Sequence, residues 1–275
     1  MTLATLTDVL TPARAAGHAV AGLVVLGWED ARAYVAAAEA EGAPIILQAG
    51  PGCRAHTPLP VLAAMFRTLA EGASVPVVAH LDHGDGMDVC ARAIDCGFTS
   101  VMFDGSRLPL DRNIDQTAAI AAMAHAAGVS IEAELGFVGY HGGASSQGTD
   151  PDQAARFWRE TGIDALAVSV GNSHLMTSGE ATLDLSRLRA IHAACPGLPL
   201  VIHGGSGIAV AARASLARDY GVAKFNIGTE LRQAFGASLR ATLAADAEVF
   251  DRIAILSATI PALTEAARRA IRSCS

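Results

Sequence analysis

Short apolar segments recur along this chain, and amphipathic segments separate most of them. The apolar segments are rich in β-branched residues and do not alternate strictly with polar residues, which is typical of strands buried on both faces of a sheet. Eight of them are predicted as strands: residues 19–26, 44–49, 76–81, 99–104, 129–134, 164–170, 199–203 and 222–227. Helical periodicity marks residues 30–42, 59–72, 87–97, 115–128 and 211–221, and a last helix near 260–272.

Alternating strands and helices predict a parallel sheet of the α/β class. Eight strands in 275 residues match the size of a (β/α)8 TIM barrel. We therefore expect a single barrel domain over residues 1–275, with a C-terminal helical extension. A doubly wound open sheet is the alternative, but no predicted strand is followed by GxGxxG, which removes its main support.

The composition narrows the class of protein further. Hydrophobic residues make up 51% of the chain and charged residues 17%, which excludes disorder and predicts a large core. The net charge of −7 and the lack of a dense Lys/Arg cluster argue against nucleic acid and membrane partners. Five cysteines without a CxxC pair, and a first segment without a basic region, lead us to expect reduced thiols and a cytoplasmic location.

Polar side chains gather where the predicted strands end. The C-terminal ends of barrel strands form the face that carries active sites in this fold. Six strand ends contribute such residues: HLDHG (80–84), DGS (104–106), EAELG (132–136), GNSH (171–174), HGGSG (203–207) and NIGT (226–229). If the fold is correct, these six segments meet at one mouth of the barrel.

Three of these ends carry a histidine: His83, His174 and His203. Three neutral imidazoles with one open position form a catalytic zinc site, and another divalent metal is possible. A single histidine is more often an ordinary core residue, but the shared location of these three favours ligands. The other histidines share that location less well.

Carboxylates accompany these histidines. Asp82 precedes His83 and would exchange protons with a substrate hydroxyl, or else it braces the loop or caps a helix. Asp104 and Glu134 are candidate metal ligands, with bracing of the histidines or an ordinary place at a strand end as the alternatives.

Small residues at two further strand ends suit an anion. The backbone N–H groups of HGGSG (203–207) can approach a phosphate closely, ahead of a helix beginning near Ala209. Thr229 adds a hydroxyl at the neighbouring strand end, and barrels of this type often bind phosphate after strands seven and eight.

With these motifs in view, the chain resembles the class II, metal-dependent fructose-bisphosphate and tagatose-bisphosphate aldolases. The resemblance covers nearly the whole chain and depends most on HLDHG (80–84) and HGGSGI (203–208), with GFTSVMFDGS (97–106), EAELG (132–136), TGIDALAVSVG (161–171) and KFNIGTELR (224–232) in support. It implies zinc held by His83, His174 and His203, and a second metal position near Asp104 and Glu134.

The resemblance also implies a substrate and a chemistry. The implied substrate is a small sugar phosphate, which such an enzyme would cleave reversibly to dihydroxyacetone phosphate and an aldehyde. Asp82 removes the C4 hydroxyl proton, the C3–C4 bond breaks, and zinc acts as a Lewis acid. The residues implied to bind dihydroxyacetone phosphate are Leu175, Gly204, Gly205, Ser206, Asn226, Ile227, Gly228 and Thr229.

Several positions depart from the family pattern. Leu23-Val24 and Gly50 stand where relatives carry polar groups, and Leu175 replaces a glycine. The loop GYHGGASSQGTD (139–150) lacks the family's acidic residues, so His141 is the nearest candidate for that catalytic role, with a plain flexible lid as the alternative. We therefore expect a ketose 1-phosphate or a related hydroxyketone as substrate, and not fructose 1,6-bisphosphate.

Two other functions remain as alternatives. A metal-dependent barrel hydrolase would usually carry HxH on its first strand, and residues 19–26 contain none. A non-catalytic barrel that binds sugar phosphates would need no metal. The family resemblance further implies a homodimer or homotetramer.

Overall fold

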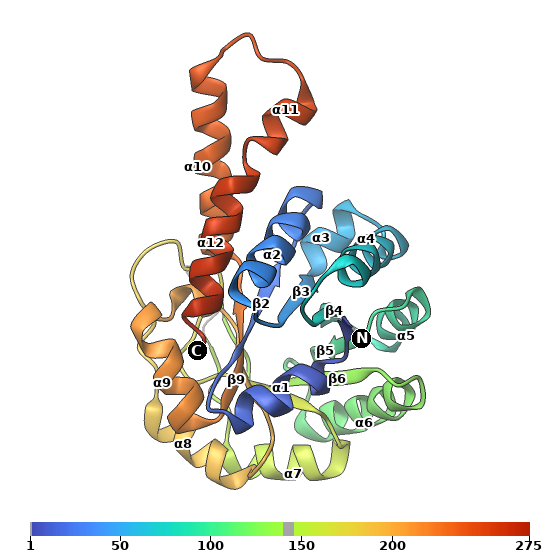
Figure 1. Ribbon diagram of the computed structural model, residues 1–275. Helices are drawn as coiled ribbons and strands as arrows, with labels where there is room; N and C mark the ends of the chain where they lie inside the picture. The colour runs from blue at the N-terminus through green and yellow to red at the C-terminus, as the bar shows by residue number, and fades with distance from the viewer. Residues whose placement is uncertain (1, 140–145) are drawn as a thin grey trace.

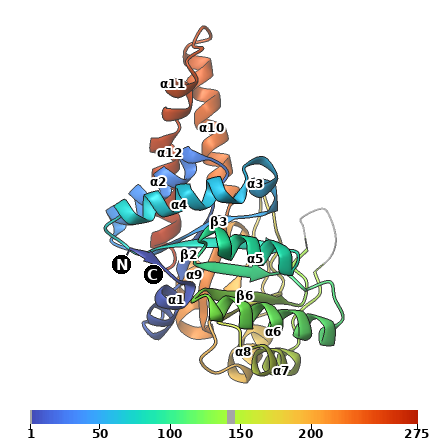
Figure 2. The same ribbon diagram turned by 90° about the vertical axis from the view of Figure 1, so that its right-hand side faces the viewer.

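Eight parallel strands close into a barrel in the computed structural model, which describes residues 2–139 and 146–275 (Figures 1 and 2). Around the barrel the strands follow the order β4-β3-β2-β9-β8-β7-β6-β5, and β5 pairs with β4 to complete the ring. The strands are β2 (Val20–Val24), β3 (Ile45–Ala49), β4 (Val77–Gly84), β5 (Ser100–Phe103), β6 (Ser130–Leu135), β7 (Ala165–Val168), β8 (Leu200–Ile202) and β9 (Val222–Ile227). The predicted (β/α)8 fold and its eight strands are confirmed.

The structure adds one short strand to the prediction and extends another, while several other strands are one to three residues shorter than predicted. A short ninth strand, β1 (Leu3–Ala4), pairs with the start of β4. Strand β4 also continues to Gly84, beyond the predicted end at residue 81, because Gly84 still pairs with Phe103 of β5 after an irregularity in register. The polar segment HLDHG is therefore part of a strand and does not follow one.

Most of the described helices cover the outside of the barrel. The described helices are α1 (Leu6–Ala15), α2 (Trp28–Glu41), α3 (Pro51–His56), α4 (Leu59–Gly72), α5 (Met87–Cys96), α6 (Leu110–Ala126), α7 (Pro151–Thr161), α8 (Leu185–Ala194), α9 (Val210–Tyr220), α10 (Thr229–Ala245), α11 (Arg252–Ser257) and α12 (Ile260–Arg272). The predicted helices correspond to α2, α4, α5, α6, α9 and α12. The structure describes no helix that is long and apolar enough to cross a bilayer.

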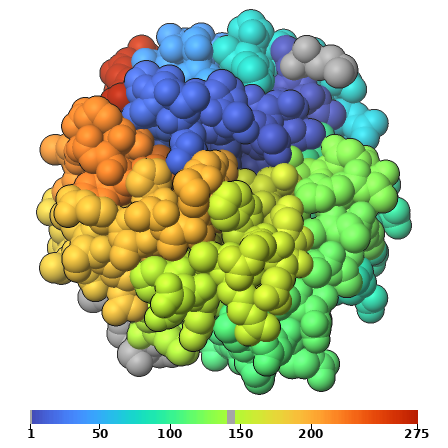
Figure 3. Space-filling model, turned by 90° about the horizontal axis from the view of Figure 1, so that it is seen from below, coloured from blue at the N-terminus to red at the C-terminus, as the bar shows by residue number. Residues whose placement is uncertain are grey.

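Helix α1 closes the N-terminal end of the barrel. Its residues Leu6, Val9 and Leu10 are buried in one cluster with Val78 and other inward-facing apolar side chains of the strands. Its residue Thr7 also hydrogen-bonds to Ser130 at the start of β6. In Figure 3 the blue N-terminal segment lies directly against the later, green to orange, segments. The apolar side chains of α1 and of the strands therefore fill this end of the barrel.

The inward-facing residues of each strand form layers, because successive side chains of a strand alternate between its two faces. On β4, Val78 belongs to the apolar layer near α1, His80 is fully buried above it, and Asp82 lines a pocket at the open end. On β6, Glu132 and Glu134 occupy the corresponding upper positions and are buried. The candidate catalytic and metal-binding residues therefore lie directly above a layer of buried polar side chains in the barrel interior.

Candidate active site and metal centre

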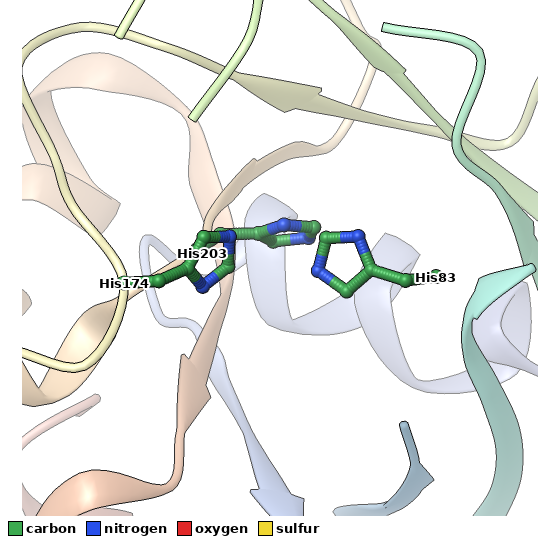
Figure 4. Close-up of side chains that lie close together, drawn as sticks. All are labelled: His83, His174 and His203. Atoms are coloured by element: carbon green, nitrogen blue, oxygen red, sulfur yellow. The ribbon is translucent and has the colours of Figure 1, made fainter. Parts of the chain in front are cut away.

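The three histidines predicted as ligands meet at the open end of the barrel (Figure 4). Their ring centroids are 4.7 Å apart for His83 and His203, 5.2 Å for His83 and His174, and 5.6 Å for His174 and His203. One ring nitrogen of each lies within 4.8 Å of one nitrogen of the other two. This spacing suits three ligands of one metal ion.

His83 is held by a carboxylate that leaves one of its nitrogens free for the centre. Its Nδ1 hydrogen-bonds to Asp104 Oδ2 at 2.8 Å, and Asp104 in turn accepts hydrogen bonds from the backbone N–H and the hydroxyl of Ser106. Burial alone would raise the pKa of Asp104, but His83 and Ser106 hold it well below its usual range. An ionised Asp104 therefore orients the imidazole of His83.

His203 is oriented by a different carboxylate. It is fully buried, and its Nε2 N–H donates to Glu132 Oε1 at 3.0 Å. Its Nδ1 lies 3.2 Å from Glu134 Oε2, without the geometry of a hydrogen bond. Burial would lower the pKa of His203, but the two carboxylates outweigh it and raise the pKa to about 10.

His174 comes from the segment after β7. Its backbone N–H donates to Gly139 O at 2.9 Å. Burial, reinforced by His203 and His83, lowers its pKa to about 3, so the ring is neutral at physiological pH. The next residue, Leu175, has φ 56°, a backbone conformation that favours glycine. Leu175 thus keeps the backbone shape of a glycine position while adding a half-exposed side chain at the pocket mouth.

Two buried atoms indicate that these residues fit a cation. His203 Nδ1 and Glu134 Oε2 have no hydrogen-bond partner, and buried polar atoms are rarely left without one. His83, Asp104 and Glu134 also form a second group whose ligand atoms lie within 4.8 Å of one another. The described residues therefore fit a three-histidine metal position and a neighbouring position that shares His83.

Asp82 lies beside this centre and faces the same pocket. It is 6% exposed, and its Oδ1 accepts a hydrogen bond from Asn226 Nδ2 at 3.2 Å. Burial would raise its pKa, but the surrounding His83, His203 and Lys224 lower it, so the carboxylate is ionised at neutral pH. A side chain at Gly50 would place its Cβ 3.3 Å from Asp82 Oδ2, so the glycine leaves that oxygen accessible.

The pocket has a volume of about 270 Å³ and contains most of the predicted phosphate-binding residues. Those on its wall are Leu175, Gly204, Ser206, Asn226, Gly228 and Thr229, whereas Gly205 and Ile227 are buried behind it. The Ser206 hydroxyl accepts hydrogen bonds from the backbone N–H groups of Gly228 and Glu230, which joins the two loops.

At Gly204, a Cβ would sit 2.1 Å from Ser173 O, so only glycine fits. Within the predicted 203–207 loop, Gly205–Gly207 form a short 3₁₀ turn, and helix α9 begins after it at Val210.

Sequence reasoning missed a guanidinium that fixes the strand ends. Arg54 of helix α3 donates to three backbone carbonyls: Ala49 O at 2.8 Å, Asp82 O at 2.5 Å and His83 O at 3.0 Å. His83 has φ 49°, an unfavourable conformation for a residue with a side chain. Arg54 thus helps hold the backbone that presents Asp82 and His83, and nothing in its local sequence indicates this role.

We expect Arg54→Ala to lower the free energy of unfolding by about 2–3 kcal/mol, because hydrogen bonds from a charged donor to partly buried carbonyls are lost. Urea unfolding of the purified variant measures this. The control is Arg92→Ala, which removes an exposed arginine without a hydrogen bond to any described residue. Equal losses for the two variants would contradict the role of Arg54.

Two more residues at the site had no role assigned from the sequence, although both lie in the segment KFNIGTELR (224–232). Lys224 is the only lysine of the chain, and it is fully buried in the barrel. Arg232 is exposed at the pocket edge and is the only Lys or Arg among the described residues that line it. His141, the predicted replacement for the loop acid, lies outside the described residues.

Comparisons with known proteins agree with this geometry. The family model of class II fructose-bisphosphate aldolase matches residues 4–275. The chain is 38% identical over 259 residues to a probable fructose-bisphosphate aldolase of Bacillus subtilis, covering 91% of this chain and 90% of that protein. It is also 38% identical over 248 residues to a 6-phospho-5-dehydro-2-deoxy-D-gluconate aldolase of Shouchella clausii, covering 88% and 84% of the two chains.

Solved structures show the same relationship. The crystal structure of the YdjI aldolase from Escherichia coli K12 superimposes with a TM-score of 0.86 at 32% identity, covering 99% of this chain and 97% of that one. A putative fructose-1,6-bisphosphate aldolase from Coccidioides immitis has a TM-score of 0.83 at 26% identity, with coverage of 98% and 96%. The chain therefore belongs to the class II fructose-bisphosphate aldolase family and is a carbon–carbon lyase of the aldehyde-lyase type.

Proposed function

We propose that this protein is a zinc-dependent aldolase that reversibly cleaves a ketose 1-phosphate to dihydroxyacetone phosphate and an aldehyde. The observation that carries the proposal is the placement of three histidine nitrogens within 4.8 Å of one another, in the same pocket as the ionised carboxylate of Asp82. A non-catalytic binding barrel would need neither a preformed ligand set nor a base beside it.

Zinc is the metal that the donor set favours. Three neutral imidazoles with an open position are typical of catalytic zinc, whereas magnesium and calcium prefer oxygen ligands. We propose His83 Nε2 and His203 Nδ1 as ligand atoms, since the other nitrogen of each ring is engaged by a carboxylate. Asp104 and Glu134 would hold the metal in its second position together with His83.

The residues of the chain divide the chemistry between them. A bound divalent metal would supply Lewis-acid catalysis, because it stabilises the negative charge that develops on the substrate oxygens. Asp82 accepts the proton of the C4 hydroxyl through its accessible Oδ2, while Asn226 holds its Oδ1. Gly204, Ser206 and Thr229 line the wall of the pocket that would bind the phosphate.

The aldehyde half of the pocket sets the substrate. Val24 and Gly50 line it and offer no polar side chain, and Arg232 at its edge supplies one cation. The relatives from B. subtilis and S. clausii are equally similar to this chain, yet they carry names for two different substrates. Membership of the family therefore leaves the aldehyde open, and the apolar wall favours one without a second phosphate.

We expect at least a tenfold higher kcat/KM for a ketose 1-phosphate than for fructose 1,6-bisphosphate, which corresponds to about 1.4 kcal/mol of differential transition-state binding. The measurement is the release of dihydroxyacetone phosphate by the zinc-loaded enzyme from fructose 1-phosphate, tagatose 1,6-bisphosphate and fructose 1,6-bisphosphate. The Asp82→Ala variant is the blank for contaminating aldolases. A clear preference for fructose 1,6-bisphosphate would reject the proposed substrate but leave the aldolase chemistry intact.

We propose a homodimer or homotetramer as the assembled form. The end of helix α10, helix α11 and the start of helix α12 project from the barrel in both ribbon views (Figures 1 and 2). Phe250 is 92% exposed and Ile253 is 76% exposed on this projection. Neighbouring large apolar side chains on a projecting element are typical of a protein interface.

The double variant Phe250→Asp/Ile253→Asp is expected to lower the molar mass of the assembly, because charges at the interface oppose apolar burial. Size-exclusion chromatography with light scattering measures the mass. Val210→Asp on helix α9 is the matched control, since Val210 is 59% exposed but lies away from the projection. A wild-type protein that elutes as a monomer would contradict the proposed assembly.

The proposed location is the cytoplasm. All five cysteines are free thiols, and four of them are buried. Free thiols persist in a reducing compartment, which supports this location.

A further inference from the structure

A series of buried polar side chains, joined by hydrogen bonds, lies beneath the proposed metal centre. The Nζ of Lys224 donates to Glu132 Oε2 at 2.6 Å, and the other oxygen of Glu132 accepts the Nε2 N–H of His203 at 3.0 Å. Lys224 also donates to His80 Nε2 at 3.3 Å, and His80 Nδ1 hydrogen-bonds to the Ser100 hydroxyl at 2.8 Å. All five residues have 0% exposure. These hydrogen bonds therefore connect the ammonium group of Lys224 in the barrel core directly, through Glu132, to His203, which is a proposed metal ligand.

The barrel interior is built around this lysine. Lys224 is the single lysine among 20 basic residues, and all the others are arginines. At Gly22 on the neighbouring strand β2, a Cβ would lie 3.0 Å from the Lys224 side chain and 1.7 Å from Gln48 Oε1. A glycine at this place on the barrel wall leaves the space that the lysine occupies.

The stability of the fold does not explain a buried lysine paired with a buried glutamate. A buried ion pair is often no better than apolar residues of similar volume, since both charges must leave water. The layer immediately below, with Ile46, Val78 and Val201, shows that apolar residues fill this barrel well. Because Lys224 lies beneath His203, we look for its role in the metal centre above it.

We propose that Lys224 is a positioning residue for the metal centre: through Glu132 it fixes the ring orientation and the tautomer of His203, so that Nδ1 faces His83 and His174. The inference rests on the metal-dependent function proposed above. With its second oxygen held by Lys224, Glu132 presents only Oε1 to His203. The Nε2 N–H of His203 is thereby held in a hydrogen bond. Its Nδ1, which has no hydrogen-bond partner, remains as the atom that would bind the metal.

Zinc affinity tests this role directly. Competition with a chromophoric chelator gives the affinities of the wild type, Lys224→Met, Glu132→Gln and the double variant. Loss of a residue that orients a metal ligand weakens binding by about 10- to 100-fold, and we expect this for each single variant. If Lys224 acts through Glu132, the double variant binds no more weakly than Glu132→Gln alone, because the effects are not additive.

The matched control is Ile46→Ala, which removes a buried side chain from the apolar layer of the same barrel. It should lower the unfolding midpoint of the metal-free protein and leave zinc affinity unchanged. If Lys224→Met does not fold because Glu132 is left unpaired, the double variant removes both charges and still reports zinc affinity. Wild-type affinity in a folded variant without Lys224 would overturn the proposal.

A spectroscopic measurement needs no variant. Because the chain has one lysine, protein labelled with ¹⁵N and ¹³C in lysine gives a single side-chain ammonium signal. We expect zinc to shift this signal until one equivalent is bound; a signal that does not move as zinc binds would overturn the coupling. A wild type that binds no zinc would reject the metal centre itself, which separates that failure from a failure of Lys224.

Discussion

Replacing Asp82 with alanine is expected to lower kcat for aldol cleavage by about 10²- to 10⁴-fold, the usual contribution of a positioned general base. The carboxylate faces the pocket, is ionised, and has one oxygen held by Asn226. No other carboxylate among the described residues lines this pocket. Bound zinc should stay near the wild-type amount, because Asp82 belongs to neither group of proposed ligands.

Steady-state cleavage rates and metal analysis of the same preparation check this prediction. Asp85→Ala is the matched control, since Asp85 is an exposed carboxylate just beyond the same strand. Its turnover should equal that of the wild type. An Asp82→Ala enzyme that binds zinc and turns over normally would show that another group moves the proton.

Removing the metal is expected to abolish cleavage, and this is the largest effect that we predict. Without a cation, nothing at the three-histidine position offsets the charge that develops on the substrate oxygens. Acid should act in the same direction as a chelator. His203 has a pKa of about 10, so metal binding at neutral pH must displace its proton, and affinity falls as pH falls.

The fold was predictable because its signal is repeated. The eight strands are largely buried on both faces and are therefore rich in apolar residues, as in Ala165–Val168. Helix α1 was not singled out, although Thr5 and Asp8 form a capping box at its start. It contains Pro12 and packs on the end of the barrel instead of crossing between two strands. The strand–helix alternation does not indicate such an element.

The metal ligands were predictable for a topological reason. His83, His174 and His203 are far apart in sequence, but the C-terminal ends of barrel strands lie on one face. Their supporting residues were not predictable in this way. Lys224 and Glu132 are 92 positions apart on strands that are not neighbours, and only the barrel register brings them into contact. Arg54 is on a six-residue helix, which is too short for its hydrophobic pattern to indicate where the side chain points.

The most direct test of metal-dependent aldol cleavage is to restore zinc stepwise to chelated, metal-free protein while measuring dihydroxyacetone phosphate released from a ketose 1-phosphate. The prediction is no release at the start, and activity that rises in proportion to zinc until the three-histidine position is full. Full cleavage by protein shown to be free of metal would contradict the proposed function.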